Sequence, residues 1–368
     1  MNKYVFIALS FLFSASAHAF PEMIRHHYVN CGACHVSQTG GGVLNAYGRT
    51  ISYDVLSTWG GAQEARAFYA VDPEKIGTWL NLGGDVRSIE VHQENSQSKT
   101  GRFFMMQGGI DAAVTVDRFT AMMTLGQVVG QRNEAYQTLD FVSPKFYLSA
   151  QVTDEFSVRA GKFIPQFGLQ IPQHTFYIKQ NLKIGEGTER DTAEAIYNGE
   201  QWNFSAAVAK SSAKSAVRDE EKSVSLQILK NIVDSHKVGV SLWNGDADQY
   251  KRDMIGIHAV SGWTEKFYTL AEIDHVKSKS KTTNVETKSI YQLLKAGYEF
   301  HKGIHAQVVE QWGRPDLDTS NENQSLGAGL IWYPRPHFEF EMLWAKQRTL
   351  AIDKAFEDYA YLQTHFYF

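Results

Sequence analysis

Two cysteines and one histidine form the stretch of this sequence whose spacing is best suited to specific chemistry, Cys31-Gly32-Ala33-Cys34-His35. Two thiols separated by two residues can each add to a vinyl group of one haem, and the histidine that follows is placed to take an axial position on the iron. No other cysteine occurs in the 368 residues. The spacing therefore predicts one covalent haem c, attached to Cys31 and Cys34, with His35 as the proximal ligand.

Two other interpretations of the motif use the same cysteines. A redox-active dithiol needs only the two thiols, and a zinc site needs two further ligands, which His26 and His27 can supply. Neither explains a histidine directly after the second cysteine. If a haem is bound, Met23, His26 and His27 are the candidates for its distal ligand in this segment, and methionine there raises the reduction potential relative to histidine. We expect His26 or His27.

The start of the chain has the features of a secretory signal. Lys3 supplies a positive charge, Val5 to Phe13 a short apolar core, and Ala17-His18-Ala19 a small-residue cleavage site, so residues 1–19 are predicted to be removed. Haem is attached to such motifs outside the cytoplasm, so export is consistent with a haem site. We find no later run of about twenty apolar residues that would form a membrane-spanning helix.

Composition narrows the class of protein further. The chain is 43% hydrophobic with a mean hydropathy of -0.32, yet 13% of its residues are Phe, Trp or Tyr. This combination is typical of membrane barrels, in which strands alternate between lipid and water and carry aromatic girdles. Loss of the signal removes one lysine and no acid, so the formal charge changes from -4 to -5. A negative net charge of this kind gives no basic surface for nucleic acid.

Residues 20–76 are predicted to be a small, partly helical haem-binding segment. Three consecutive glycines, Gly40 to Gly42, permit positive φ and a close approach to a flat macrocycle, although an ordinary flexible turn explains them equally well. Residues 43–59 and 62–70 have a weak helical pattern, broken by Gly60-Gly61. The segment is too small for a large core of its own, so a haem would supply much of what it packs around.

From residue 77 to residue 368 the hydrophobic pattern has a period of two. Near the end, one face carries Phe338, Phe340, Met342 and Trp344 and the other carries Glu339 and Glu341, which places the two acids towards a lumen. The last strand alternates in the same way and ends in an aromatic residue, Phe368, which resembles the signal by which outer-membrane barrels are recognised for insertion.

The predicted connections alternate between tight turns and long polar loops. The tight turns lie near residues 116–118, 153–155, 198–200, 233–235, 262–264, 301–303 and 333–336. The long loops lie near 92–101, 131–137, 164–189, 211–221, 245–251, 277–287, 314–323 and 348–356. This alternation predicts a transmembrane antiparallel β-barrel of about 16 strands with both ends in the periplasm. A soluble sandwich or propeller is the main alternative fold.

Some side chains are predicted to lie inside the barrel, whose lumen is wide enough for a loop or a small domain. Residues 161–168, with the pattern G-K-F-x-P-x-F-G, resemble a stretch of anion-selective and related porins that leads into an inward-folded loop. An ordinary external loop is the alternative. His258, His305 and His365 fall on the inward face near the periplasmic strand ends and offer another source of a distal ligand, although barrel interiors are normally polar without such a role.

The order of signal, haem motif, barrel and terminal aromatic residue resembles the fused class of monohaem c-type cytochrome and outer-membrane porin, which includes outer-membrane iron-oxidising cytochromes. Residues 20–30 share little with the pattern A-x-P-x-F-A-R-Q-T-G of those iron-oxidising members beyond an early proline. The resemblance implies an outer-membrane location, with the haem segment at the periplasmic side or in the lumen. It implies electron transfer across the membrane, a periplasmic electron carrier as partner, contact with outer-membrane lipid, and an extracellular metal ion or oxide as donor or acceptor, with metal oxidase or reductase activity.

A function of a different class fits the same organisation. In a solute-conducting porin, the haem segment serves as a plug, a sensor or a docking site, and the lumen with Lys162 and the following loop selects the solute. No catalytic triad, phosphate-binding loop or paired-carboxylate motif stands out in the sequence.

Overall fold

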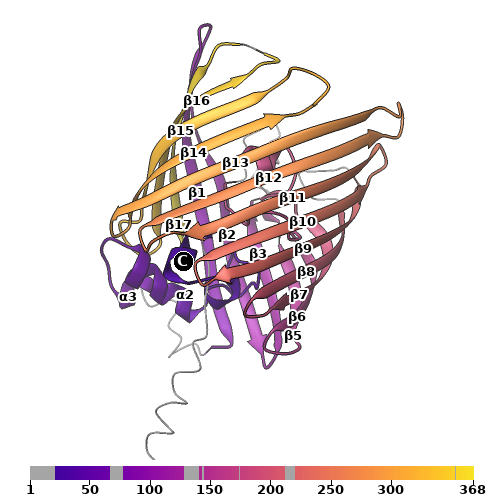
Figure 1. The fold of residues 1–368 in the computed structure, drawn as a ribbon. Coiled ribbons are helices and arrows are strands. Elements are labelled where there is room, and N and C mark those ends of the chain that lie inside the picture. Colours follow the sequence, from indigo (N-terminus) through magenta and orange to yellow (C-terminus); the bar gives the residue numbers. More distant parts are fainter. Residues whose placement is uncertain are drawn as a thin grey trace, which may run out of the picture.

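The protein is a closed antiparallel β-barrel of sixteen strands (Figure 1). The computed structural model describes residues 21–66, 78–127, 141–142, 145–173, 175–211, 220–352 and 354–368. Each strand pairs with its neighbours in the sequence, and the first strand, β1 (Leu80–Glu94), also pairs with the last, β17 (Glu357–Tyr367), which closes the ring. The predicted fold and strand number are therefore confirmed. The predicted signal peptide lies outside the described residues.

The remaining strands follow one another around the barrel. They are β2 (Lys99–Val116), β3 (Phe119–Gln127), β4 (Phe141–Val142), β5 (Phe146–Gln151), β6 (Phe156–Phe163), β7 (Arg190–Asn198), β8 (Trp202–Ser211), β9 (Lys222–Val233), β10 (His236–Asp246), β11 (Tyr250–Gly262), β12 (Phe267–Ser280), β13 (Glu286–His301), β14 (Ile304–Arg314), β15 (Asn323–Trp332) and β16 (Phe338–Thr349). Both β4 and β5 pair with β3 along its length, so they form one strand of the barrel.

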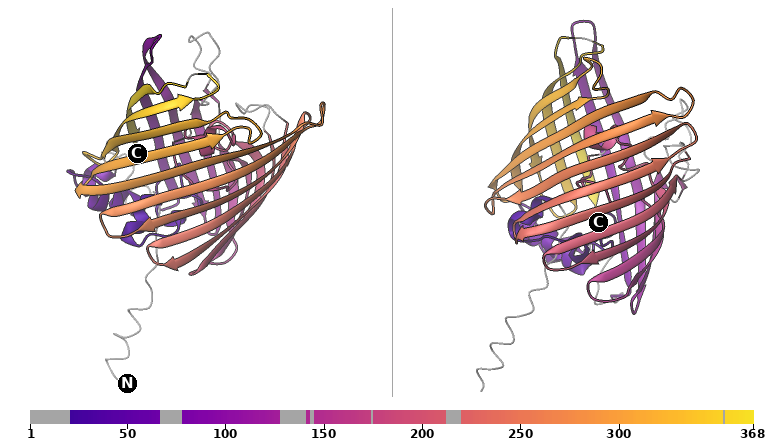
Figure 2. Two further views of the ribbon diagram at one scale, coloured as in Figure 1. Left: turned by 45° about the horizontal axis from the view of Figure 1, so that its top comes forward. Right: turned by 45° about the vertical axis from the view of Figure 1, so that its right-hand side comes forward.

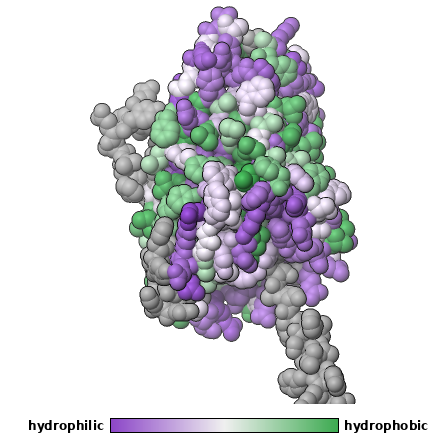
Figure 3. Space-filling view, turned by 90° about the vertical axis from the view of Figure 1, so that its left-hand side faces the viewer, coloured by the Kyte–Doolittle hydropathy of each residue, from purple (hydrophilic) through white to green (hydrophobic). Residues whose placement is uncertain are grey.

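The strands alternate between a buried inner face and an exposed outer face. In β16, Glu339 and Glu341 are buried inside while Met342 and Trp344 are exposed outside, as the sequence predicts. The polar side chains thus lie inside and the apolar ones outside, the reverse of a soluble protein and typical of a membrane barrel. Hydrophobic side chains gather across the middle of the face in Figure 3, with hydrophilic side chains above and below.

Connections at one end of the barrel, here called the short-turn end, have two to five residues. All seven predicted tight turns lie there. At the other end, three connections that were predicted to be long loops are short. Their strands continue beyond the apolar belt, so only residues 95–98, 247–249 and 281–285 connect them. The predicted loop at 131–137 lies outside the described residues.

The described part of the predicted haem segment, residues 21–66, is called the N-terminal segment below. It contains η1 (Pro21–His26), η2 (Cys31–Ala33), α2 (Ala46–Ile51), η3 (Ser52–Leu56) and α3 (Ala62–Ala65). Both ribbon views of Figure 2 place it at the short-turn end, beside the C-terminus. No helix among the described residues is both long enough and apolar enough to cross a membrane. Gly40, Gly41 and Gly42 all have positive φ, a conformation that glycine adopts without strain.

The connection between β6 and β7, residues 164–189, folds into the lumen and is called the inward loop below. Its short helix α5 (Tyr177–Gln180) and the residues around it bury apolar side chains against the inner faces of β10 to β14. These side chains are Phe167, Leu169, Phe176, Ile178, Leu182 and Ile184. The inward position predicted from the G-K-F-x-P-x-F-G stretch is therefore confirmed, and the loop gives the lumen an apolar core.

Candidate haem-binding site

The cysteines and the histidine of the motif lie in one helical turn. The backbone N–H groups of Cys34 and His35 both donate to the carbonyl oxygen of Cys31, at 3.2 and 3.1 Å. These two hydrogen bonds bring the three residues close together in the chain. Their side chains have different surroundings, because Cys31 borders a cavity, Cys34 lies in an apolar cluster with Met23 and Leu44, and His35 forms a β-bridge with Leu44.

One buried and one partly buried ion pair fix the N-terminal segment to the barrel wall. Arg25 Nη1 lies 2.9 Å from Glu299 Oε2 in β13, and Glu22 Oε1 lies 3.1 Å from Lys295 Nζ in the same strand. The Arg25 side chain is completely buried. A buried charge needs a paired partner, because removing it from water costs several kcal/mol. These pairs therefore determine where η1 lies in the opening.

Further polar contacts join the N-terminal segment to strands on several sides of the barrel. They are Arg49 to the carbonyl of Leu82, Ser37 with Arg159 at 3.1 Å, Asn30 with Asn203, Lys237 to the carbonyl of Val29, and Ser52 with Tyr367 at 3.1 Å. These contacts reach β1, β6, β8, β10 and β17. The segment consequently lies across the opening at the short-turn end rather than along one side of it.

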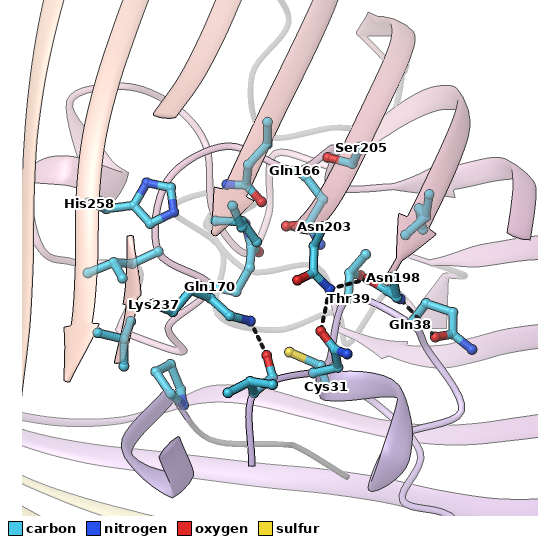
Figure 4. A pocket seen from close by; sticks show the side chains of 18 of the residues that line it. Cys31, Gln38, Thr39, Gln166, Gln170, Asn198, Asn203, Ser205, Lys237 and His258 are labelled. Atoms are coloured by element: carbon cyan, nitrogen blue, oxygen red, sulfur yellow. Dashed lines mark hydrogen bonds between the residues drawn. The ribbon is translucent and has the colours of Figure 1, made fainter. Parts of the chain in front are cut away.

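A cavity separates the N-terminal segment from the inner wall of the barrel (Figure 4). The space inside it that can hold the centres of water-sized spheres is about 110 Å³, and Cys31 lies on its border. Amide and hydroxyl side chains make up much of the lining, which comprises Asn30, Gln38, Thr39, Gln166, Gln170, Asn198, Asn203, Ser205 and Gln227. Lys237 and His258 enter it from the wall. This space is smaller than ordinary ligand pockets, which hold about 300–1,000 Å³.

Burial favours the protonated form of both thiols. It raises the pKa of Cys34 to about 12 and also raises that of Cys31, which the Lys237 ammonium offsets only in part. A reactive dithiol needs the opposite shift, a lowered pKa. The zinc interpretation also finds no support, since no group of three or more His, Cys, Asp or Glu side chains that could hold a metal ion occurs in the described part of the chain.

The predicted axial ligands differ in their surroundings. Burial lowers the pKa of His35 to about 4, although hydrogen bonding with the backbone of Gly41 and Gly42 opposes this effect. The imidazole is therefore neutral at pH 7, which is the form that binds a metal. His26 is also neutral, because burial lowers its pKa to about 4. His27 is exposed and has a positive φ of 66°.

Met23 and the three inward histidines complete the set of candidates. Met23 packs with Cys34, Leu44 and Tyr367 in an apolar cluster beneath the motif. His258, His305 and His365 all face inward and are buried, as predicted. Of these three, only His258 lines the cavity that Cys31 borders.

The residues present fit a covalently bound haem in their chemistry. Two thiols and a neutral imidazole lie within five consecutive residues, and a cavity adjoins the first thiol. Cys34 and His35 do not line that cavity. Cys31 and Cys34 would hold the porphyrin through thioether bonds and His35 would bind its iron.

The fold defines a class, the antiparallel barrels of the outer-membrane type. Solved structures with this fold include a loop-deletion mutant of OmpT, an outer membrane protein of Vibrio cholerae, with a TM-score of 0.62, 8% identity, and coverage of 78% of this chain and 99% of that one. The anion-selective porin from Comamonas acidovorans matches with a TM-score of 0.55, 11% identity, and coverage of 78% and 99%. The outer membrane channel DcaP of Acinetobacter baumannii matches with a TM-score of 0.56 and 13% identity, over 78% of this chain and 97% of that one.

These likenesses show the fold and leave about a fifth of this chain without a counterpart. No protein-family model matches the sequence. No curated protein matches it either.

The sequence did not reveal the residues that hold the N-terminal segment in place. Arg25 and Glu299 are 274 positions apart, and nothing in their local patterns links them. The one sequence feature that pointed to this pair is that Glu299 is an inward-facing acid near a tight turn. Glu339 and other acids of the lumen have the same feature, so it does not single out Glu299. The sequence also did not reveal the amide-rich lining of the cavity, because its residues come from distant parts of the chain that only the fold brings together.

Proposed function

We propose that this chain is an outer-membrane barrel of the porin type whose periplasmic opening is closed by the N-terminal segment, and that this segment carries one haem c on Cys31 and Cys34. The observation that carries the proposal is the position of the motif. It lies in the N-terminal segment, which ion pairs of η1 hold in the barrel mouth, and Cys31 borders a cavity.

The outer surface of the barrel supports a place in a membrane. Exposed apolar side chains occur along successive strands, among them Leu148, Val208, Ile257, Val308 and Leu326. Exposed aromatic residues cluster next to the tight turns at Phe119, Trp202, Trp263, Phe267 and Phe300. Aromatic girdles at the edge of an apolar belt mark the membrane interface of such barrels. The short-turn end is then periplasmic, because periplasmic turns are the short ones.

The compared structures favour a channel-type function, because two of them are an anion-selective porin and an outer membrane channel. In that function the N-terminal segment is a plug, and its ion pairs with Lys295 and Glu299 hold the closed state. The haem-bearing turn would then make the plug a sensor or a docking site for a periplasmic partner. Solutes would pass only when the segment and the inward loop both move.

Electron transfer across the outer membrane is the second candidate. The packed lumen favours it, because the inward loop buries Phe167, Ile178 and Leu182 against the wall in the region where an open pore would run. A bound haem supplies reversible one-electron chemistry whose potential is set by its axial ligands and its burial. His35 would bind the iron, and the closed lumen would exclude water from it. The partners would be a periplasmic electron carrier and an extracellular metal ion or oxide.

One set of measurements tests the haem and separates the two functions. The full chain is produced in a host that attaches haem in the periplasm, and the intact mass of the purified membrane protein is measured. We expect the mass of the chain plus one haem, and loss of that mass in Cys31→Ala/Cys34→Ala. A wild-type chain without haem, or a protein that is soluble after gentle lysis, overturns the proposal.

The same preparation is then reconstituted into vesicles that enclose a reductant-sensitive dye. Electron transfer that disappears in His35→Ala while ion conductance stays unchanged supports the conduit. Conductance in the wild type without electron transfer supports the channel.

A further inference from the structure

We propose that Trp59 of the N-terminal segment lies in the lipid interface outside the barrel, so that the segment is anchored to the membrane as well as to the lumen. The inference rests on the membrane location in the proposed function and does not depend on a bound haem. Trp59 is 58% exposed, as much as the lipid-facing Trp344 of β16 at 54%. Unlike Trp344, it belongs to the segment that closes the opening and not to the barrel wall.

The strand beside Trp59 shows on which side of the wall this side chain lies. In β15, Leu330 is 41% exposed on the outer face and Ile331 only 2% on the inner face. Trp332 follows Leu330 by two positions and therefore belongs to the outer face. Its ring centroid lies 5.8 Å from that of Phe340, its cross-strand partner in β16. Trp332 is thus part of the aromatic surface that faces the lipid.

Two contacts place the N-terminal segment against the indole of Trp332. The rings of Trp59 and Trp332 meet edge to face, with centroids 5.9 Å apart and an angle of 81° between their planes. The Nε1–H group of Trp332 donates to Thr58 Oγ1 at 3.3 Å. Because this indole is on the outer face, Thr58 and Trp59 lie over the rim on the outer side. An indole has an apolar body and one N–H donor, which suits the boundary between lipid tails and headgroups.

The backbone of the segment fits closely between two tight turns where it crosses the rim. The N–H groups of Thr58 and Trp59 donate to carbonyl oxygens of the β15–β16 connection at 2.8 and 2.9 Å. In the β13–β14 turn, Gly303 has a φ of 76°, and a Cβ atom there would lie 2.7 Å from the amide nitrogen of Thr58. Gly60 has a φ of 114°, and its Cβ atom would clash with Pro336. The helix α3, which follows, lies at the edge of the opening (Figure 1).

The N-terminal segment is then held at two places that differ in kind. Inside the barrel, Arg25 and Glu22 of η1 pair with Glu299 and Lys295 of β13. Outside the barrel, the lipid interface holds Trp59. When the inner pairs break, the outer contact keeps the stretch at the rim in place, so the segment swings about this stretch instead of moving away from the opening.

The test locates Trp59 by fluorine NMR of the full chain, labelled with fluorotryptophan and placed in nanodiscs of phosphatidylcholine and phosphatidylglycerol. The resonance that is missing from Trp59→Phe is that of Trp59, and the signals of Trp344 and Trp243 are assigned in the same way. A lipid with a nitroxide next to its headgroup broadens the signals of side chains in the interface. We expect Trp59 to be broadened as strongly as Trp344 and several times more than Trp243, which is buried inside the barrel.

Broadening of Trp344 but not of Trp59 overturns the inference. Broadening of Trp59 mainly by a water-soluble gadolinium chelate also overturns it, because the ring then faces the periplasm. Absence of broadening at Trp344 as well would instead contradict the membrane location in the proposed function. If Trp59→Phe does not fold, the signal is assigned from Trp332→Phe, which removes the ring against which Trp59 packs and shifts its resonance.

A second measurement tests whether Trp59 holds the segment. Glu299→Gln, which lacks the buried inner pair, is compared in the same nanodiscs with Glu299→Gln/Trp59→Ala and with the control Glu299→Gln/Trp344→Ala. We expect protease to cleave residues 21–66 several times faster after the loss of Trp59, and at an unchanged rate after the loss of Trp344, which is equally exposed but distant from the segment. Equal rates in all three proteins would contradict the anchoring role.

Discussion

Arg25 in η1 and Glu299 in β13 form an ion pair of 2.9 Å at the mouth of the barrel, and the arginine side chain is completely buried. The pair joins a segment near the start of the chain to a strand near its end. It is the clearest sign that the N-terminal segment is part of the folded barrel and not a tether beside it.

Breaking this pair should release the N-terminal segment. Glu299→Gln leaves the Arg25 guanidinium buried without its anion, and removing one partner of a buried pair costs about 3–5 kcal/mol. We expect residues 21–66 to be cleaved by protease much faster in this variant than in the wild type while the barrel resists. Glu64→Gln is the matched control, since it breaks the exposed pair with Arg335, and such pairs are worth about 0–1 kcal/mol. Equal cleavage rates in all three proteins would contradict the role of Arg25.

Shortening Phe167 should loosen the inward loop. The side chain is completely buried and packs edge-on against Trp243, with 6.3 Å between the ring centroids. Replacement of a buried phenylalanine by alanine costs about 3–5 kcal/mol. Phe167→Ala should therefore lower the temperature at which the loop becomes accessible to hydrogen exchange. Leu148→Ala, on the lipid-facing surface, should leave it unchanged.

Removal of the N-terminal segment alone should open the barrel only partly. The inward loop still fills the lumen after deletion of residues 21–66, because its apolar side chains pack against the barrel wall and not against that segment alone. We expect a small rise in single-channel conductance for this deletion, and a large rise when residues 166–185 are also replaced by a short linker. Full conductance after the first deletion would show that the loop does not obstruct the lumen.

Acid should detach the N-terminal segment in protein prepared without haem. Burial lowers the pKa of His26 from 6.5 to about 4, so the unfolded segment binds this proton more readily than the docked one. The stabilisation from a neutral His26 is complete above pH 6.5 and is lost as the pH falls from 6.5 towards 4. Protease protection of residues 21–66 should decline across this window, and less steeply in His26→Gln. The same decline in both proteins would assign the effect to carboxylates instead.

Much of the barrel follows from local pattern. The alternation of Phe338 to Trp344 defines an inner and an outer face, and the seven tight turns fix the number of hairpins. The strand ends are less predictable, since β1 and β2 continue to residues 94 and 99 where both faces are already polar. There the ladder is extended by backbone pairing, which the hydrophobic pattern does not record.

The site was predictable only in its local part. The spacing of Cys31, Cys34 and His35 identified the turn that the structure contains. The position of that turn depends on Glu299, Lys295, Asn203 and Lys237, which come from other strands and are brought together only by closure of the barrel. Haem attachment is a prediction for the mass measurement described above.

The backbone of Phe368 exchanges two hydrogen bonds with Gly84, at 3.0 and 3.2 Å, so the final residue seals the ring against its first strand. The N-terminal segment contacts both sides of this seam, through Leu82 in β1 and Tyr367 in β17. Its binding surface therefore does not exist until β17 has been made and has paired with β1. On the proposed function, the haem is attached while that segment is still free, and the maturing barrel then folds around a cargo that is already in place.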